Sequence, residues 1–143
     1  MTKEEIISKL PYASPFLFVD EINNIDEKGV EGSFTFNPNL EIYKGHFKNN
    51  PVTPGVILTE VMAQIGVVCL GIFLLNDTAN KNTVFALTSS EIAFLKPVYP
   101  TQKVTVISKK IYFRFGKLKC KVTMSNESGE EVCNGTIAGM IVE

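Results

Sequence analysis

The sequence predicts an α+β domain in which an antiparallel sheet is wrapped around one long apolar central helix. Residues 54–75 carry helical start and stop signals and are apolar almost all round, so this helix must be enclosed by other elements. The segments on either side alternate apolar and polar residues with the period of two that is typical of strands. The predicted order is a short helix, two strands, the long helix and four strands, which is an α+β layout.

Length and composition indicate one globular domain over residues 1–143. The chain is 45% hydrophobic, which suffices for a core, and its 14 basic and 15 acidic side chains argue against nucleic-acid binding. Cys69, Cys120 and Cys133 stand among apolar neighbours, which predicts buried free thiols in a reducing compartment. One histidine cannot complete a zinc site, so no metal is expected. We expect no signal peptide and, because the apolar run 65–75 is short, no membrane span; the predicted location is the cytoplasm.

Turn and capping residues separate the first three elements. A short helix is predicted after Thr2 and is stopped by Pro11. Residues 16–23 are predicted as the first strand. Residues 30–36 alternate clearly and are predicted as the second, after a turn at 26–29.

The middle of the chain is predicted to be a functional loop followed by the long helix. Residues 37–54 are rich in Asn, Pro and Gly, and irregular loops of this length in small domains tend to be functional. Thr53 can cap the helix and Pro54 suits its first position. The helix is predicted to run to about Leu75 and to end at Asn76.

The last part of the chain is predicted to form four strands joined by turns. Pro97 and Pro100 end the first of these strands, and Gly116 and the segment 126–129 supply two of the turns. The predicted strands are 84–95, 103–115, 117–124 and 132–142.

His46 is the single histidine and lies in the predicted loop. Imidazole is the side chain that changes its charge closest to neutral pH, so His46 is the candidate general base. Solvation or a structural hydrogen bond is the alternative interpretation of a histidine in a loop.

The first turns of the long helix hold three further candidates. Glu60 has apolar neighbours, and a buried carboxylate must be hydrogen-bonded or protonated; an exposed Glu that complements the positive helix end is the alternative. Gln64 lies on the same face, four residues on, and can hold Glu60 or a substrate, although packing alone also explains it. Gly55 offers a backbone N–H without a helical acceptor and no Cβ, so a carbonyl can approach; an ordinary helix start is the alternative.

The segment Gly45–Gln64, GHFKNNPVTPGVILTEVMAQ, resembles the signature of the 3-hydroxyacyl-[acyl-carrier-protein] dehydratases of bacterial fatty-acid synthesis. That family has GHF, then P, PGV and a helix of the type E-A-x-A-Q. Leu10-Pro11 with Pro15–Asp20 is similar to its LPH-x-x-PFLLVD, and Phe94–Pro100 is similar to its F-K-x-PV-x-PGD. The resemblance covers nearly the whole chain in order.

The resemblance implies the hot dog fold, an acyl carrier protein as partner and no cofactor. It also implies a homodimer or a trimer of dimers with active sites at the dimer interface. His46 and Glu60 carry over as catalytic residues, contributed to one site by different subunits, and Gly55 as the backbone donor to the thioester carbonyl.

The chain departs from the family pattern at several positions. Tyr12 stands where the family has His, Lys48-Asn49 where it has Pro-Gly, Val61 where it has Ala, and Thr101 where it has Gly. None of these changes removes a catalytic group, but they bear on substrate preference and loop shape.

The predicted reaction converts a (3R)-hydroxyacyl thioester to the trans-2-enoyl thioester. His46 would take the C2 proton while the Gly55 N–H stabilises charge on the thioester oxygen. Glu60, its pKa raised by apolar surroundings, would protonate the departing hydroxyl. Phe85 and Phe94, with the helix, would line an acyl tunnel or simply form core. Candidate docking charges for an acidic carrier protein are Lys44, Lys48, Lys96 and Lys103.

Two other functions stay open from the sequence. A hot dog acyl thioesterase also uses a carboxylate in this helix but needs no histidine, and Glu41 is a rival acid to Glu60. A non-catalytic subunit in a mixed dimer with a related dehydratase is the other, against which intact His46 and Glu60 count. Membrane fatty acids, lipid A chains and polyene pigments are all open as the acyl product.

Overall fold

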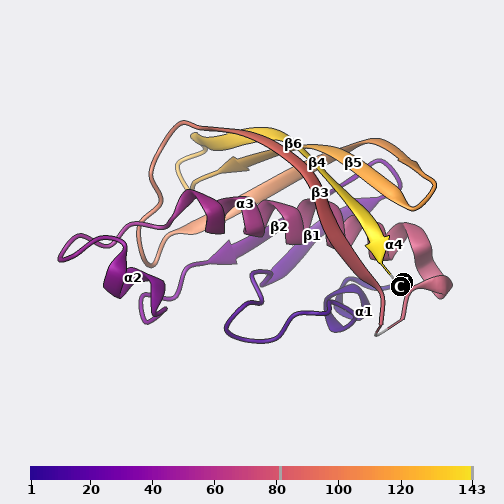
Figure 1. Ribbon diagram of the computed structural model, residues 1–143, viewed down its shortest axis with the longest axis horizontal. Helices are drawn as coiled ribbons and strands as arrows, with labels where there is room; N and C mark the ends of the chain where they lie inside the picture. Colours follow the sequence, from indigo (N-terminus) through magenta and orange to yellow (C-terminus); the bar gives the residue numbers. More distant parts are fainter. Residues whose placement is uncertain (81, 143) are drawn as a thin grey trace.

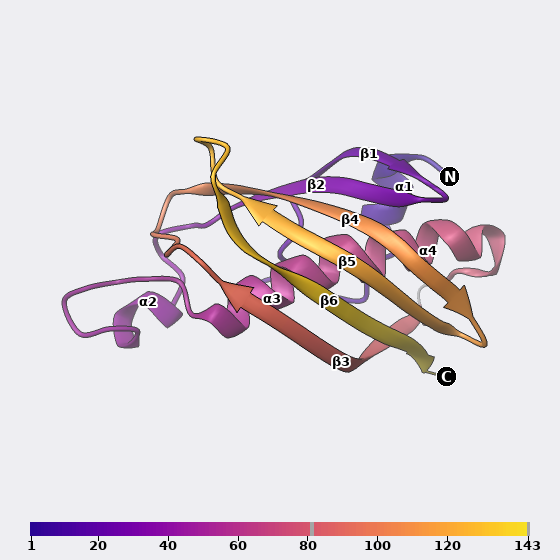
Figure 2. The same cartoon turned by 90° about the horizontal axis from the view of Figure 1, so that it is seen from above.

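The computed structural model describes residues 1–80 and 82–142, in which one antiparallel sheet curves over a central helix (Figure 1). Viewed from above, the strands cross the helix in the order β1-β2-β4-β5-β6-β3 (Figure 2). The strands are β1 (Glu21–Asp26), β2 (Gly29–Thr35), β3 (Val84–Phe94), β4 (Lys103–Arg114), β5 (Lys117–Ser125) and β6 (Glu131–Val142). The predicted α+β layout, with its order of elements, is confirmed.

The central helix is built from three consecutive segments. They are α3 (Gly55–Ala63), a π-helical turn η1 (Gln64–Cys69) and α4 (Leu70–Leu75), followed by a short 3-10 turn, η2 (Asn76–Thr78). Every residue of η1 is buried, as a helix that is apolar all round requires. The π-helical turn was not predicted; there the Ser108 hydroxyl of β4 donates to the Gly66 carbonyl at 2.8 Å.

The expectation of no membrane span considered only the short run 65–75, whereas the whole helix Gly55–Thr78 has 24 residues. Its most apolar 18 residues have a mean hydropathy of 2.1, so by length and composition alone the helix could cross a membrane. Of this stretch 67% is buried inside the molecule, as expected of a core helix.

The concave face of the sheet supplies the other half of the core. In β5, the residues Leu118, Cys120, Val122 and Met124 are fully buried and alternate with lysines and Thr123 on the outer face. The three cysteines are free and buried, as predicted, and burial raises the pKa of each thiol.

Three local predictions were wrong. Residues 16–20 are not strand, because the backbone at Phe16 and Phe18 bonds to the buried Gln64 side chain instead of a neighbouring strand. The loop 37–54 contains a short helix, α2 (Ile42–Gly45). Thr53 does not cap α3; its hydroxyl lies 2.6 Å from the Tyr43 hydroxyl, and Pro54 is the cap residue.

The N-terminal helix and the turns follow the predictions. Helix α1 (Lys3–Ser8) is capped by the Thr2 hydroxyl, which accepts from the Glu5 N–H. The Asp26 carboxylate closes the β1–β2 turn by accepting from the backbone N–H groups of Lys28 and Gly29. Strand β3 is the last strand at one edge of the sheet, and its inner side pairs with β6.

Candidate active site

Glu60 is held in a half-buried position on α3 by the side chain of Gln64. Gln64 is fully buried, and its Nε2 donates to Glu60 Oε2 and to the Phe16 carbonyl, each at 2.9 Å. Its Oε1 accepts from the Phe18 N–H at 2.8 Å. The Gln64 amide therefore ties the predicted acid to the N-terminal segment of the chain.

Burial raises the pKa of the Glu60 carboxyl, and the hydrogen bond from Gln64 partly opposes the rise. The predicted direction is confirmed, and its main cause is desolvation. A carboxyl in this setting keeps its proton to higher pH than an exposed Glu does, which is what a general acid needs.

Glu60 and Gly55 line one cavity of about 610 Å³. Gly55 is the first residue of α3, so its N–H has no acceptor within the helix. Helix α3 forms one wall, where a Cβ on Gly55 would lie 3.2 Å from the Phe94 ring, so glycine leaves room between the helix and this ring. The other wall comes from the edge strand, through Leu87, Ser90, Ile92 and Phe94.

His46 follows α2, and its ring is oriented by the backbone. The Nδ1 atom lies 2.9 Å from the Val52 carbonyl oxygen, and the ring stacks on Phe47 with centroids 4.0 Å apart. A carbonyl oxygen only accepts, so Nδ1 carries the proton in the neutral ring and Nε2 presents its lone pair. This tautomer suits a base that acts through Nε2.

The structure brings Glu60, Gly55 and Gln64 together within the chain but does not add His46 to them. The described cavities that Glu60 lines do not include His46 among their lining residues. The rival acid Glu41 has a side chain that is 83% exposed and pairs with Lys44 at 3.0 Å on the surface, away from these cavities.

The comparisons with known proteins decide the family. A family model described as FabA-like domain matches residues 10–139. The chain belongs to the FabA-like dehydratase family.

Relatives of this FabA-like chain are named as members of the enzyme family whose motifs its sequence resembles. It is 33% identical over 135 residues to the 3-hydroxyacyl-[acyl-carrier-protein] dehydratase FabZ of Caldicellulosiruptor bescii, with 94% of each chain covered. It is 34% identical over 143 residues to FabZ of Bartonella quintana, with 98% of this chain and 89% of the relative covered. The resemblance found in the sequence is confirmed.

Solved structures show the same hot dog fold. The ApeI:P dehydratase heterocomplex of Xenorhabdus doucetiae matches with a TM-score of 0.81 at 11% identity, covering 100% of this chain and 93% of that one. A hypothetical thioesterase of Streptococcus pneumoniae bound to coenzyme A matches with a TM-score of 0.62 at 16% identity, covering 85% and 84%. At these identities the likeness concerns the fold alone.

Two departures of this FabA-like chain from the family pattern lie at unusual backbone positions. Asn49 and Thr101 stand where the family has Gly, and both have positive φ, 57° and 75°. Glycine adopts such conformations without strain, whereas a β-branched Thr does not.

Tyr12 lies beside Glu60, and this proximity was not predicted. It lines a second cavity of about 60 Å³ together with Glu60, Phe85 and Leu87. Burial, with the neighbouring Glu60 and Cys69 as smaller causes, raises the pKa of Tyr12 to about 12, so the phenol stays protonated. Its position in the motif, where the family has His, was the available signal.

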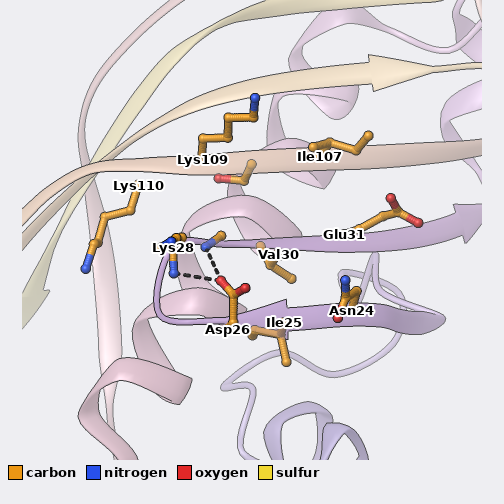
Figure 3. A pocket seen from close by; sticks show the side chains of 11 residues that line it. Asn24, Ile25, Asp26, Lys28, Val30, Glu31, Ile107, Lys109 and Lys110 are labelled. Carbon is orange, nitrogen blue, oxygen red and sulfur yellow. Dashed lines mark hydrogen bonds between the residues drawn. The ribbon is translucent and has the colours of Figure 1, made fainter.

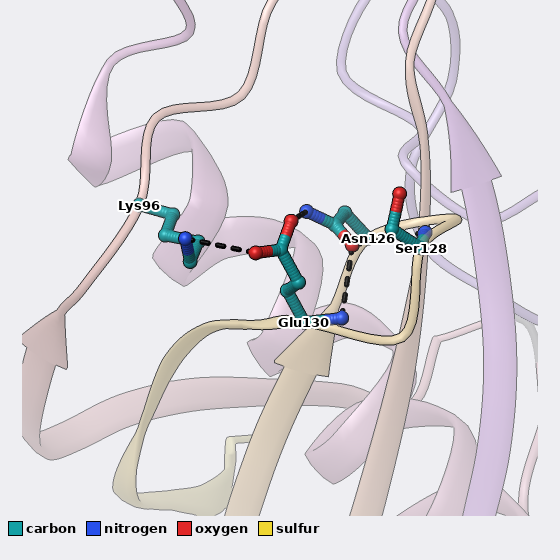
Figure 4. Close-up of polar contacts among 4 residues, drawn as sticks. All are labelled: Lys96, Asn126, Ser128 and Glu130. Carbon is teal, nitrogen blue, oxygen red and sulfur yellow. Dashed lines mark hydrogen bonds and ion pairs between the residues drawn. The ribbon is translucent and has the colours of Figure 1, made fainter.

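Two of the four predicted docking lysines form ion pairs. Lys44 pairs with Glu41, and Lys96 pairs with Glu130 at 2.9 Å, with Asn126 holding the carboxylate from its other side (Figure 4). The hydrogen bond from Lys96 is the main cause that lowers the pKa of Glu130. These pairs reduce the net positive charge that Lys44 and Lys96 offer to an acidic partner.

A further concavity of about 560 Å³ lies between the β1–β2 hairpin and β4 (Figure 3). Asp26 and Glu31 supply its two carboxylates, and Oδ1 of Asp26 accepts from the two backbone N–H groups of the turn.

Proposed function

We propose that this chain dehydrates (3R)-3-hydroxyacyl thioesters carried by acyl carrier protein to trans-2-enoyl thioesters, in the cytoplasm and in fatty-acid synthesis. The observation that carries the proposal is a half-buried Glu60 with raised pKa, sharing a cavity with the free N–H end of the central helix. The names of the FabZ relatives support the same reaction and carrier.

In this mechanism, Glu60 is the general acid. Gln64 holds the Oε2 oxygen, which leaves Oε1 for the substrate among the hydrogen bonds of the described residues. The protonated carboxyl gives its proton to the C3 hydroxyl, which leaves as water when the C3–O bond breaks.

His46 is the general base and Gly55 the oxyanion donor. The Nε2 lone pair takes the C2 proton, and the C–H electron pair forms the new C2–C3 double bond as the hydroxyl leaves. The thioester oxygen carries transient negative charge, which the Gly55 N–H and the positive end of the helix stabilise. The reaction needs no redox partner, and we propose no cofactor.

We further propose that the complete site forms in a homodimer or a trimer of dimers. Strand β3 is an edge strand with unpaired backbone groups, and Leu87 and Phe94 on it are 56% and 51% exposed. The cavity beside Glu60 opens along this strand. A second copy paired at β3 would cover these side chains and supply its His46 to the Glu60 of the first.

The two cavities beside Glu60 suggest where the acyl chain lies. Glu60, Ala63 and Leu87 line both the larger cavity and the smaller one of about 60 Å³. Phe85 and Val68 also line the smaller cavity. We propose that the chain passes Glu60 toward Phe85, which then limits its length.

The test is a dehydration assay on carrier-bound 3-hydroxyacyl chains of several lengths, with enoyl product and free thiol measured in parallel. Enoyl product without thiol release supports the dehydratase, and thiol release alone would assign a thioesterase. His46→Ala is expected to lower turnover by roughly 100-fold or more, while Glu41→Gln, the control at the rival acid, keeps wild-type activity. Near-normal dehydration by His46→Ala would refute the mechanism.

The same preparations separate self-assembly from a mixed complex. A purified chain that is active alone as a dimer or hexamer supports the proposal. Inactivity alone, with activity restored by a second hot dog chain that copurifies, would assign the chain as a partner subunit.

A further inference from the structure

The β4–β5 hairpin concentrates the positive charge of the chain. Residues 103–121 contain seven of the fourteen Lys and Arg side chains and none of the fifteen Asp and Glu side chains. The rest of the chain is therefore strongly acidic, and the net charge of −1 conceals a two-sided distribution.

Most of these cations gather on the outer face of the sheet. Lys117, Lys119 and Lys121 alternate with fully buried residues of β5 and so point away from the core. Lys109 pairs with Lys121 across the strands, and Figure 3 shows it leaving β4 on the side opposite to Lys110. We call Lys109, Arg114, Lys117, Lys119 and Lys121 the basic face.

The basic face carries charge at a cost to the fold. Lys109 lies directly opposite Lys121, and Arg114 directly opposite Lys117, and like charges in these positions repel. Arg114 also stacks on the Tyr112 ring, 4.4 Å from its centroid. Within residues 1–80 and 82–142, both ion pairs, Lys44–Glu41 and Lys96–Glu130, lie outside this face.

The neighbouring strands do not neutralise it. In β6, the residues opposite Lys117, Lys119 and Lys121 are Met140, Ala138 and Thr136. In the row of the sheet that holds Lys109 and Lys121, the acids are Asp26 on β1 and Glu91 on β3, each two strands away from the nearer lysine.

The hairpin tip carries an aromatic side chain that the turn does not favour. Phe115 and Gly116 form a two-residue turn between β4 and β5, and both have positive φ, 51° and 75°. Turns of this type favour Asn or Gly at the first position, because a bulky side chain is strained there. Phe115 is also 95% exposed, so packing within the subunit does not compensate the strain.

Two exposed apolar side chains of β6 lie near the tip. Met140, opposite Lys117, is 40% exposed, and Val142, two residues on, is 45% exposed. A projecting aromatic ring with apolar neighbours and a row of cations behind it matches a bilayer surface, where the ring enters the interface and the cations meet anionic headgroups.

We propose that the β4–β5 hairpin binds anionic membrane surfaces, with Phe115 inserted at the headgroup level and the basic face against acidic lipids. The charge would also attract an acidic protein, but such a partner would not explain an exposed, strained aromatic ring at the projecting tip. The proposal goes beyond dehydration and does not depend on it.

The test uses the full chain with vesicles of phosphatidylcholine alone and of phosphatidylcholine mixed with phosphatidylglycerol. The wild-type chain is expected to sediment with the mixed vesicles, to be released by salt, and to ignore the neutral ones. Lys119→Gln with Lys121→Gln is expected to weaken binding about tenfold or more. The charge-matched control, Lys3→Gln with Lys44→Gln, removes two cations elsewhere and keeps binding.

Two variants at the tip separate insertion from charge alone. Phe115→Asn suits the turn and stays folded, yet is expected to lose most binding, whereas Leu95→Asn, at an exposed apolar residue beyond the opposite end of β3, keeps it. The chain has no tryptophan, so Phe115→Trp gives a single reporter whose emission shifts to the blue on mixed vesicles. Absence of wild-type binding, equal binding to neutral vesicles, or no emission shift overturns the proposal. So does the absence of vesicle binding together with a raised KM for carrier-bound substrate in the lysine variant, which would assign the face to the carrier protein.

Discussion

Replacing Gln64 by Leu tests how the acid is held. The Leu side chain fills a similar volume but removes the hydrogen bonds to the Phe18 N–H, the Phe16 carbonyl and Glu60. The Phe18 N–H would be left buried and unpaired, while the Phe16 carbonyl, in an exposed residue, can be hydrated. An unpaired buried group costs about 1–3 kcal/mol, so we expect the free energy of unfolding to fall by about 2–3 kcal/mol.

The same variant should also change the pH dependence of catalysis. The bond from Gln64 lowers the pKa of Glu60, so its loss raises that pKa further. Activity requires protonated Glu60, so the alkaline limb of the kcat/KM profile should move to higher pH.

Denaturant unfolding at fixed protein concentration and a pH–rate profile measure the two effects. Ser108→Ala is the matched control, because it removes another buried hydrogen bond to the central helix, the one to Gly66. It should cost about 1 kcal/mol and leave the pH profile unchanged. A Gln64→Leu variant with wild-type stability, or with an unmoved alkaline limb, would refute the assigned role.

Three further outcomes are expected. Glu60→Gln should remove a pH dependence of the free energy of unfolding. Because the pKa of Glu60 is raised in the folded state, that state binds more protons than the unfolded state, so wild-type stability falls as pH rises above the usual Glu range. Unfolding measured across pH should show no such slope in the variant. Phe85→Leu should shift the preferred substrate toward longer acyl chains, measured as kcat/KM ratios; an unchanged ratio would contradict the proposed path of the chain. Thr101→Gly should raise the free energy of unfolding by about 1 kcal/mol by relieving its positive φ, and a loss of stability would count against that strain.

Patterns that act over a few residues were sufficient for most of the fold. The alternation in β5 and the apolar surface of the central helix each depend on burial against one layer, which periodicity reports directly. The predicted start of the first strand was wrong because the contact that decides it is not local. The backbone at Phe18 is satisfied by Gln64, 46 residues away, and local pattern carries no sign of such a partner.

The candidate site was likewise predictable from the sequence only in part. The chemical types of His46, Glu60, Gly55 and Gln64 are visible in the motif, and the apolar neighbours of Glu60 predict the direction of its pKa. Phe85 and Phe94 of β3 were named as possible tunnel residues, but Tyr12 and Leu87 were missed, because their proximity to Glu60 depends on how the N-terminal segment and the edge strand pack on the helix. The proposed contribution of His46 from a second copy depends on assembly, which periodicity within one chain does not encode.

Subunit complementation tests the central claim most directly. His46→Ala and Glu60→Gln chains with different tags are coexpressed, and oligomers that carry both tags are purified. A site built from His46 of one subunit and Glu60 of the other leaves intact sites in these mixed oligomers, so dehydration should return to roughly a quarter to a half of the wild-type rate. Mixed oligomers as inactive as each variant alone would contradict the shared acid–base site.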